Sequence, residues 1–307
     1  MRIAVIDLGT NTCNLLIAEI ENGDYRILHQ SKRLVKLGDD KIRENEISLA
    51  ATQRTIEAFK SHKNIVQEFG VDEVLVLATS AVRSATNKTE YLEKLKKETG
   101  LQVEVISGEE EAELIFRGVL LAFKELEYPA AILDIGGGSN EIILTQQNKM
   151  IWKESKPTGM SRIINQFALS DPIKGDEVLK LQNFFAEQHA EAVNSSMNES
   201  VKMLIGCSGA FDTIADMIDG VKPGEKQRTT QDISLEDFYA VYTTLLKSTR
   251  AERIRIKGMD QVRVDLIVPA VILIENLIQQ IGINKIVQTD FALREGVLFD
   301  YLQKNPF

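Results

Sequence analysis

The sequence contains few of the residues that build metal clusters, disulfides or nucleophile triads. Only 2 of its 307 residues are cysteines, Cys13 and Cys207, and they lie far apart and outside any Cys-x-x-Cys motif. We therefore expect a reduced, cytoplasmic protein. The 3 histidines, His29, His62 and His189, lie on segments that the sequence does not relate to one another. Their scatter argues against a histidine-rich metal site or a Ser-His-Asp triad, and it leaves carboxylates for any proton transfer.

Long apolar runs and an excess of positive charge are also absent from the sequence. No apolar run approaches the roughly 18–20 residues that span a bilayer, and the segment from Met1 to Asp7 has no signal-peptide pattern. The formal net charge of −9 disfavours a general nucleic-acid binder. We therefore expect no membrane and no nucleic-acid partner, although a local basic patch or a metal ion can still attract a polyanion.

What remains is an ordinary globular composition, with 44% hydrophobic and 26% charged residues. Such proportions are typical of a folded, water-soluble protein. At roughly 100–200 residues per domain, a chain of this length is expected to form about two domains.

The most informative stretch runs from Ile132 to Glu141, where an apolar strand leads into Asp134, three glycines, Ser139, Asn140 and Glu141. Glycines have no Cβ atom, so backbone N–H groups approach an anion closely, and such concave nests hold phosphate oxygens. A carboxylate at the end of the preceding strand is well placed for a divalent cation that phosphates share. A glycine-rich hairpin turn that binds nothing would explain the same residues taken alone.

The beginning of the chain repeats this pattern. The two copies align at a single offset of 127 positions, Asp7 with Asp134, Gly9 with Gly136 and Thr12 with Ser139. A short apolar strand and a polar turn follow in both copies. A repeat of this length is not a solenoid period. It predicts two similar domains, each offering a phosphate-binding hairpin to a shared cleft.

The first half of the chain predicts three antiparallel strands followed by alternating helices and strands. Asn22-Gly23 is typical of a primed hairpin turn between two of these strands. Residues 48–69 are expected to form a helix, and the apolar strand 74–78 ends in a Thr-Ser-Ala-Val-Arg segment, where α/β sheets place ligands. Arg83 in that segment is suited to bidentate phosphate binding, or it is an exposed arginine on a surface helix.

Three consecutive glutamates, Glu109 to Glu111, begin the next predicted helix. Ser107 and Glu110 match a capping box, and acidic residues in a first turn favour the helix dipole, so Glu109 and Glu110 need no further role. Glu111 shares its helical stripe with apolar and small residues, and we expect it to point inward. A carboxylate at the mouth of a phosphate site is the group that orients or deprotonates a water molecule.

The second half predicts further helices and a second turn of small residues. An apolar strand at 202–205 leads through Ser208 and Gly209 into a helix, whose N-terminus would receive an anion, although tight strand–helix packing explains the glycines equally well. Residues 218–233 are polar and are expected to form a surface loop. Residues 247–263 carry six Lys or Arg against two Asp or Glu. That excess suits a polyanion contact, or an ordinary solvated helix face with ion pairs.

Each half is thus predicted to run β-β-β-α-β-α-β-α. Two such halves facing each other make a duplicated, ribonuclease-H-like α/β architecture of the actin type. We expect an N-terminal domain at residues 1–125 and a C-terminal domain at residues 126–307, with the terminal helix at about 298–307 able to pack back onto the first domain.

The motifs resemble one family of this superfamily, the exopolyphosphatase and guanosine pentaphosphate phosphohydrolase family. The matching stretches fall in order and cover essentially the whole chain: IDLGTNTCNLLI, LATSAVRSATN, VISGEEEAELIFRGV, ILDIGGGSNEIIL, IGCSGAFDTIADMI, RVDLIVPAVILIE and TDFALREGVLFDYL. Single motifs of this kind also occur in sugar kinases and chaperone ATPases. The combination of ISGEEEA with DIGGGSNE is specific to the family.

The resemblance implies a role for each candidate residue. It makes Glu111 the general base for the attacking water, and Arg83, Asp134 and Glu141 are the other catalytic candidates. It associates Asp134 and Glu141 with Mg²⁺, or another divalent cation, and with water, and Asp7 is a third candidate metal ligand. The phosphate loops that it implies are Gly9, Thr10, Asn11 and Thr12 in the first half and Gly136, Gly137, Gly138 and Ser139 in the second, and we add Asn140, Ser208 and Gly209 as candidate phosphate contacts.

The activity that follows is Mg²⁺-dependent removal of the terminal phosphate of inorganic polyphosphate as orthophosphate, in which positioning and charge neutralisation do most of the work. The alternative substrate is guanosine pentaphosphate. A small-molecule kinase, with the turn at 206–210 binding adenosine, and an inactive polyphosphate or alarmone sensor are more distant alternatives. A homodimer is expected from the family resemblance alone.

Overall fold

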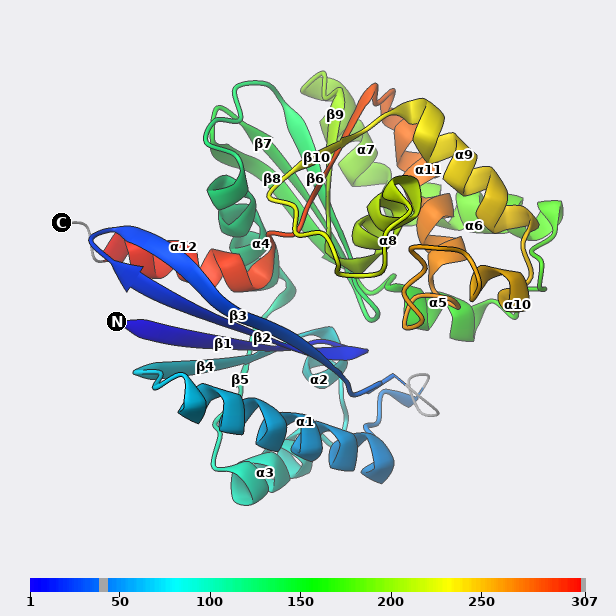
Figure 1. Ribbon diagram of the computed structural model, residues 1–307. Helices are drawn as coiled ribbons and strands as arrows, with labels where there is room; N and C mark the ends of the chain where they lie inside the picture. Colours follow the sequence, from blue (N-terminus) through cyan, green and yellow to red (C-terminus); the bar gives the residue numbers. More distant parts are fainter. Residues whose placement is uncertain (39–43, 305–307) are drawn as a thin grey trace. The chain divides into compact units, whose positions relative to one another are not determined.

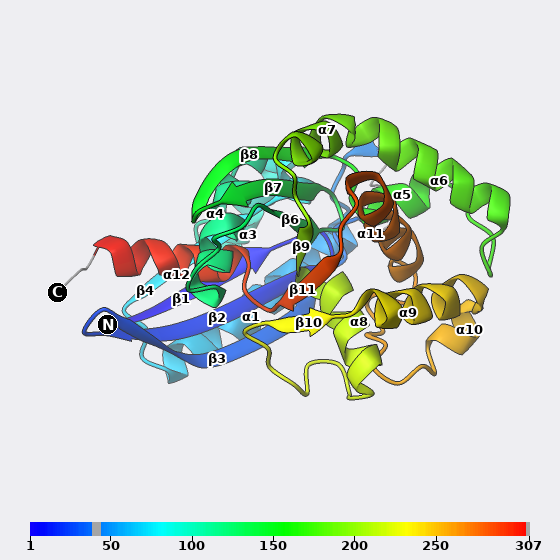
Figure 2. The same cartoon turned by 90° about the horizontal axis from the view of Figure 1, so that it is seen from above.

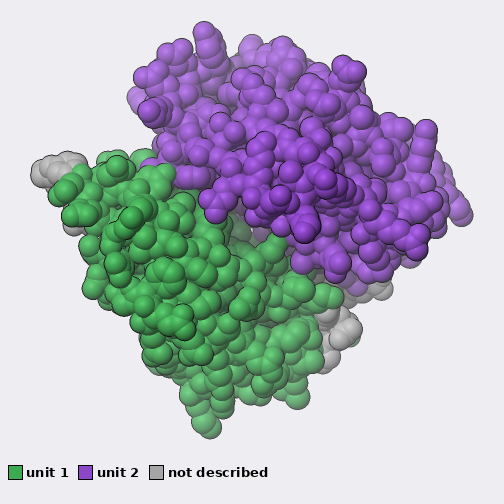
Figure 3. Space-filling model, viewed as in Figure 1, with its two compact units in different colours: residues 1–118, 293–307 green, residues 119–292 purple. Residues whose placement is uncertain are grey.

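The chain folds into two units, each with its own sheet and hydrophobic core. The computed structural model describes residues 1–38 and 44–304. The first unit contains residues 1–118 and the C-terminal segment from residue 293, and the second contains residues 119–292 (Figure 3). The chain crosses from one unit to the other within helix α4 (Gly108–Ala122) and again between Ala292 and Leu293.

The first unit is built on a mixed sheet with the strand order β3-β2-β1-β4-β5. The first three strands are antiparallel, whereas β4 and β5 run parallel to β1. Their bounds are β1 (Arg2–Leu8), β2 (Thr12–Glu21), β3 (Asp24–Leu34), β4 (Glu73–Ala78) and β5 (Glu104–Val105). Asn22 and Gly23 join β2 to β3 with φ values of 53° and 68°. Both are positive, as a primed turn requires, and this confirms the predicted hairpin.

Helices cover both faces of this first sheet. Helices α1 (Leu49–Glu68) and α3 (Lys88–Thr99) lie on one face, where Ile6, Leu15 and Phe59 contribute to the core (Figure 1). The last helix, α12 (Leu293–Lys304), packs against β1 and β2 on the other face. A Cβ atom at Gly296 would overlap the backbone of Leu114, so α12 lies directly against α4. A short helix, α2 (Ser80–Arg83), follows β4.

The second unit repeats the strand order of the first and adds one strand at the edge. Its order is β8-β7-β6-β9-β11-β10, in which β9 and β11 are parallel to β6. The bounds are β6 (Ala130–Ile135), β7 (Asn140–Gln146), β8 (Lys149–Lys156), β9 (Met203–Cys207), β10 (Gln231–Ile233) and β11 (Lys285–Thr289). The predicted duplication is therefore confirmed at the level of sheet topology.

Helix α11 (Ile267–Ile281) is the central helix of the second unit and is buried along nearly its whole length. It contacts several other helices of the unit (Figure 2), which are α5 (Met160–Gln166), α6 (Gly175–Gln188), α7 (Ala190–Asn198), α8 (Ser208–Asp219) and α9 (Leu235–Lys247). A helix that is apolar on all sides requires such a position. Across the described residues, no helix has both the length and the apolar character needed to cross a membrane.

The prediction of a surface loop at residues 218–233 is wrong at both ends. Helix α8 continues to Asp219, and Gln231–Ile233 forms β10, which pairs antiparallel with β11. A strand of three residues is too short to show an alternating pattern in the sequence. It forms because it pairs with the neighbouring strand β11. The connection between them is held by a buried ion pair, since Arg228 is 4% exposed and contacts Asp216 and Asp219.

Two of the three histidines occupy equivalent positions, contrary to the expectation that their segments are unrelated. His62 lies in α1, and His189 lies 127 positions later, between α6 and α7. This is the offset that relates the two glycine turns, and both side chains are 0% exposed. The duplication therefore includes the helix after the three antiparallel strands. Its second copy is interrupted at His189, which hides the relation at the level of sequence.

Candidate functional site

The glycine turn of the second unit, Gly136–Ser139, connects β6 to β7 and has its carbonyl groups on one side. The carbonyl oxygens of Gly136 and Gly137 accept hydrogen bonds from the backbone N–H groups of Met160 (3.0 Å) and Ser161 (2.9 Å). The carbonyl of Gly138 accepts from Nε of Arg162 at 3.0 Å. In a planar trans peptide the C=O and N–H groups point in opposite directions.

The N–H groups of Gly137, Gly138 and Ser139 therefore point away from the segment that binds the carbonyls. Among the described residues, none of these three N–H groups has a hydrogen-bond acceptor. The turn itself is closed by a hydrogen bond of 3.0 Å from Gly136 N–H to the carbonyl of Ser139. The result is a nest of three donors, which is suited to phosphate oxygens.

Gly159 is the residue that allows this arrangement, and its role was not predicted. A Cβ atom at this position would lie 2.5 Å from the backbone of Gly137 and of Gly138, and it would also overlap Ser139. The segment Thr158–Arg162 thus supports the turn from behind at the closest distance that backbones allow. Because the contact is between segments distant in sequence, no local pattern marks it.

Two candidate carboxylates, Asp134 and Glu141, lie opposite each other on β6 and β7. Directly opposed residues of antiparallel strands project from the same face, with Cβ atoms about 4.5–5.5 Å apart. Glu141 is 1% exposed and Asp134 is 9% exposed, and Glu141 accepts a hydrogen bond of 2.7 Å from the Ser155 hydroxyl. Two buried carboxylates side by side repel each other unless a cation or a proton lies near them.

The donor set of this pair fits the predicted divalent cation. Within residues 1–38 and 44–304, no group of three or more His, Cys, Asp or Glu side chains is arranged to hold a metal ion. Zn²⁺ sites need three or four such protein ligands. Mg²⁺ binds through one or two carboxylates and takes its other ligands from water and substrate phosphates. Asp134 and Glu141 would hold the ion in that second manner.

The first unit has the same glycine turn, at Gly9–Thr12. Gly9 N–H donates to the Thr12 carbonyl at 2.9 Å, as Gly136 does to Ser139. The carbonyl of Thr10 accepts a hydrogen bond from Leu37 N–H at 2.7 Å. The carbonyl of Asn11 accepts two, from Val35 N–H and Lys36 N–H, both at 3.0 Å. The chain that follows β3 thus supports the first turn, as Thr158–Arg162 supports the second.

The acidic residue beside this first turn has a different neighbour. Asp7 lies opposite Asn14, and Asn14 Nδ2 donates to Asp7 Oδ2 at 3.1 Å. Burial raises the pKa of Asp7 above its usual value, while the hydrogen bond from Asn14 and the charge of Arg294 act in the opposite direction. The first unit thus contributes one carboxylate where the second contributes two.

The remaining catalytic candidates, Arg83 and Glu111, form an ion pair within the first unit. Nη1 of Arg83 lies 2.9 Å from Oε2 of Glu111 and 3.0 Å from the carbonyl of Ile106. Glu111 is 8% exposed, in agreement with its predicted inward orientation. The predicted capping box is confirmed, because Ser107 and Glu110 exchange side-chain to backbone hydrogen bonds of 2.7 and 3.1 Å. Arg83 therefore fixes the orientation of the candidate base.

The turn at Ser208 and Gly209 begins α8, and two features distinguish it. Ser208 has a φ of 67°, a left-handed conformation that is uncommon for a residue other than glycine. The guanidinium of Arg263 lies so close to Gly209 that a Cβ atom there would overlap it. Sequence reasoning counted Arg263 only as one charge of a basic segment. The structure places it at this helix N-terminus.

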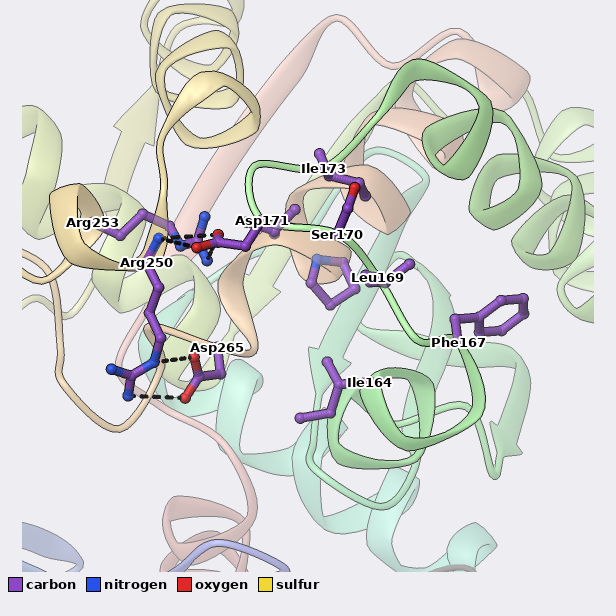
Figure 4. Close-up of a pocket in the computed structure, with 11 residues that line it drawn as sticks. Ile164, Phe167, Leu169, Ser170, Asp171, Ile173, Arg250, Arg253 and Asp265 are labelled. Atoms are coloured by element: carbon purple, nitrogen blue, oxygen red, sulfur yellow. Dashed lines mark hydrogen bonds and ion pairs between the residues drawn. The ribbon is translucent and has the colours of Figure 1, made fainter.

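Two other arginines of that basic segment, Arg250 and Arg253, form internal ion pairs. Arg253 donates to Asp171 at 2.8 Å, and Arg250 donates to Asp265 at 2.7 Å (Figure 4). These residues line a cavity of about 210 Å³ whose other walls include Ile164 and further apolar side chains. For Arg250 and Arg253, the structure thus agrees with the second of the two interpretations given above, ordinary ion pairs rather than a polyanion contact.

A duplicated ribonuclease-H-like fold whose backbone amides lie beside buried carboxylates, with no acceptor for these amides among the described residues, is suited to binding phosphate compounds. The family model described as the Ppx/GppA phosphatase family matches residues 16–305. The chain belongs to this family, which confirms the resemblance seen in its motifs. It is accordingly a hydrolase of phosphoanhydrides.

Individual proteins support this assignment. The crystal structure of an exopolyphosphatase from Cytophaga hutchinsonii matches 99% of this chain and 98% of its own, with a TM-score of 0.94 and 37% identity. Exopolyphosphatase 2 of Mycobacterium tuberculosis is 26% identical over 96% of this chain and 97% of its own length. A bifunctional 3-dehydroquinate synthase/phosphatase of Fusobacterium nucleatum is 27% identical over 96% of this chain, which spans 46% of that longer protein.

Proposed function

We propose that this protein removes the terminal phosphate of inorganic polyphosphate and releases it as orthophosphate. The observation that carries the proposal is the nest of N–H groups at Gly137, Gly138 and Ser139, next to the opposed carboxylates Asp134 and Glu141. Phosphoryl transfer depends mainly on positioning and on neutralising charge. Two similar proteins that are named exopolyphosphatases support the choice of substrate.

In this proposal the second unit binds the phosphate that is transferred. The three N–H groups hold its oxygens, and Asp134 and Glu141 hold a divalent cation, Mg²⁺ in our prediction. When bound, the ion neutralises phosphate charge that the protein's own acidic groups would otherwise repel. Ser155 restrains Glu141 through its hydrogen bond of 2.7 Å, so that the pair keeps its geometry when the substrate leaves.

The first unit supplies the groups that act on water. Glu111 orients the attacking water molecule or takes its proton, as a positioned carboxylate does in general base catalysis. Arg83 holds Glu111 through Nη1. The side-chain hydrogen bonds of Arg83 to described residues both come from Nη1, so Nη2 and Nε are the donors that we assign to substrate phosphate. Asp7 is the third candidate metal ligand. We expect it to bind the metal more weakly than Asp134 and Glu141, because one of its oxygens already accepts a hydrogen bond from Asn14.

Guanosine pentaphosphate is the second candidate substrate. It presents the same terminal phosphoanhydride, and the groups described above contact phosphate and water rather than a base. We prefer polyphosphate because the groups assigned here account for a chain of phosphates without any contact to a nucleoside. A cytoplasmic location and a homodimer remain predictions, and light scattering after size exclusion will test the second.

The assay that tests this function measures orthophosphate release from long polyphosphate, tripolyphosphate, guanosine pentaphosphate and ATP, with and without Mg²⁺. We expect release from polyphosphate that depends on Mg²⁺. Glu111→Gln should lower kcat by about 10³-fold while substrate binding is nearly unchanged, because a general base contributes roughly 10²–10⁴-fold. Retained turnover in this variant would remove Glu111 from its role. Cleavage of ATP only when a sugar or acid acceptor is present would indicate a kinase instead.

A further inference from the structure

We propose that His189 is a positioning residue that holds the glycine turn of the second unit in its phosphate-binding shape. The proposal deepens the proposed function, because it assigns the histidine to the same site. The contact runs through Thr158 and Asn140, and Glu154 anchors the histidine from behind. His189 takes no part in bond breaking and touches neither phosphate nor metal.

The four side chains form one continuous buried row. Oε1 of Glu154 lies 2.6 Å from Nδ1 of His189, and Nε2 of His189 lies 3.3 Å from Oγ1 of Thr158. Nδ2 of Asn140 donates to Oγ1 of Thr158 at 3.0 Å and to its carbonyl oxygen at 2.7 Å. His189 and Asn140 are 0% exposed and Thr158 is 2% exposed. Water therefore does not replace any of these contacts when one partner is lost.

The direction of the hydrogen bonds follows from the carbonyl group of Thr158. A carbonyl only accepts, so the NH₂ group of Asn140 must face Thr158, and the Thr158 hydroxyl oxygen accepts from it as well. In the neutral tautomer with its proton on Nδ1, His189 donates to the Glu154 carboxylate, and Nε2 accepts the hydroxyl hydrogen of Thr158. A carboxylate that fixes the tautomer and the ring orientation of a histidine is a recurrent way of positioning a site.

This row reaches the glycine turn from two sides. Thr158 immediately precedes Gly159, and the segment 159–162 binds the three carbonyls of the turn. Asn140 immediately follows Ser139 and precedes Glu141, so it stands between the last donor of the nest and the carboxylate pair. A shift of Thr158 therefore moves both the support and the end of the turn. Misplacement of reacting groups by about 1 Å costs on the order of 10²-fold in rate.

The duplication provides an internal comparison, because His62 has the same place in the first unit. Nε2 of His62 contacts only a backbone group, the carbonyl of Cys13, at 3.1 Å. Cys13 is the counterpart of Asn140 at the offset of 127 positions. Nδ1 of His62 has no hydrogen-bond partner among the described residues, so no carboxylate fixes this ring.

The support of the first turn is held by a different side chain. Nε and Nη2 of Arg54 donate to the carbonyls of Val35 and Lys36, both at 2.8 Å. Helix α1 also passes through His62 without a break, whereas the helix of the second unit ends and restarts at His189. The side-chain row of His189 is therefore specific to the unit that carries two carboxylates.

Paired substitutions of the two histidines test the proposal. The side-chain amide of asparagine reaches the position of Nδ1, and that of glutamine reaches the position of Nε2. His189→Asn therefore keeps the hydrogen bond to Glu154, and His189→Gln keeps the hydrogen bond to Thr158. We expect His189→Asn to lower kcat for orthophosphate release by about 10²-fold with a smaller change in KM. His189→Gln should retain several times more activity, because its remaining contact leads to the turn.

His62→Asn and His62→Gln are the matched controls, because both histidines are equally buried. We expect them to lower the melting temperature as much as the His189 variants do, with kcat unchanged. Equal losses of kcat at both positions, or equal activity of the two His189 variants, would overturn the proposal. Thr158→Ser, which keeps the hydroxyl, should retain activity, and the nearly isosteric Thr158→Val should lose it. This pair decides the question if the His189 variants do not fold.

A binding measurement separates this proposal from the proposed function. Calorimetric titration with pyrophosphate reports on the N–H nest without any turnover. If the wild type releases no orthophosphate from any substrate, the proposed function fails, and weaker pyrophosphate binding by His189→Asn than by His62→Asn still supports the positioning role. If the wild type hydrolyses polyphosphate and both variants bind pyrophosphate equally, the positioning role fails alone.

Discussion

The two glycine turns of this protein are closed by the same type of backbone hydrogen bond, and the charges beside them differ. In the first unit, neighbouring strands place Asp7, Asn14 and Lys32 in one row across the sheet. The equivalent row of the second unit contains Asp134, Glu141 and Ser155. The first row contains one carboxylate, one amide and one ammonium group, whereas the second contains two carboxylates and a hydroxyl.

We infer from this difference that the two units have different roles. The first row contains a single carboxylate, and Asn14 donates a hydrogen bond to it. The second row has two buried carboxylates side by side, and such a pair favours the binding of a cation or a proton. We therefore assign metal and phosphate binding to the second unit. The first unit keeps a phosphate turn and contributes the Arg83–Glu111 pair.

Neutralising the aspartate of each row gives the largest expected contrast. Asp134→Asn should lower kcat for orthophosphate release by about 10³-fold and raise the Mg²⁺ concentration needed, which is the scale of a lost transition-state contact. Asp7→Asn should lower kcat by only about tenfold, because Asn14 already binds one oxygen of Asp7. Initial rates over a range of Mg²⁺ concentrations provide the measurement. Equal losses in the two variants would show that the units do not differ as we propose.

Alanine at the first glycine of each turn should give the next largest contrast. A Cβ atom at Gly136 would lie 2.7 Å from the Ser139 carbonyl oxygen, whereas at Gly9 the nearest atom, the Thr12 carbonyl oxygen, is 3.4 Å away. We expect Gly136→Ala to lower the free energy of unfolding by about 1–3 kcal/mol and kcat by about 10²-fold. Gly9→Ala should cost less than about 0.5 kcal/mol. Urea denaturation and initial rates are the readouts, and a greater loss at Gly9 would contradict the geometry.

The smallest effect concerns stability and the burial of Asp7. Because burial raises the pKa of Asp7, the folded state binds this proton more tightly than the unfolded state, where the pKa is about 3.9. The charged form thus lowers the free energy of unfolding at neutral pH, and this penalty disappears as pH falls through the raised pKa. Asp7→Asn should be more stable than the wild type at pH 7, with the difference shrinking toward pH 4. A destabilised variant at pH 7 would contradict this account of Asp7.

Local patterns were sufficient to predict the two turns and the burial of Glu111. The glycines between two carboxylates favoured an anion nest once their repeat was seen, and the repeat at 127 positions indicated the duplicated fold. The inward orientation of Glu111 followed from the helical period alone. These features depend on residues that are close in sequence, and periodicity and spacing report on such residues.

Contacts between distant segments could not be predicted in this way. Gly159 supports the turn from the start of α5, and nothing near it in sequence marks a phosphate site. The ion pair of Arg83 with Glu111 joins two separate motifs. The equivalence of His62 and His189 was hidden because only one of their helices is continuous. Strand β10 is too short to show a period and is defined by its pairing with β11.

The most direct test of the account is a ³¹P NMR time course with long-chain polyphosphate, Mg²⁺ and the wild-type protein. Hydrolysis at chain ends predicts that the orthophosphate signal rises as the internal phosphate signal falls, while the signal of terminal phosphates stays constant. The spectrum should change little with Asp134→Asn and should change readily with Asp7→Asn. A rising terminal signal would mean internal cleavage, and a spectrum that does not change with the wild type would contradict the central claim.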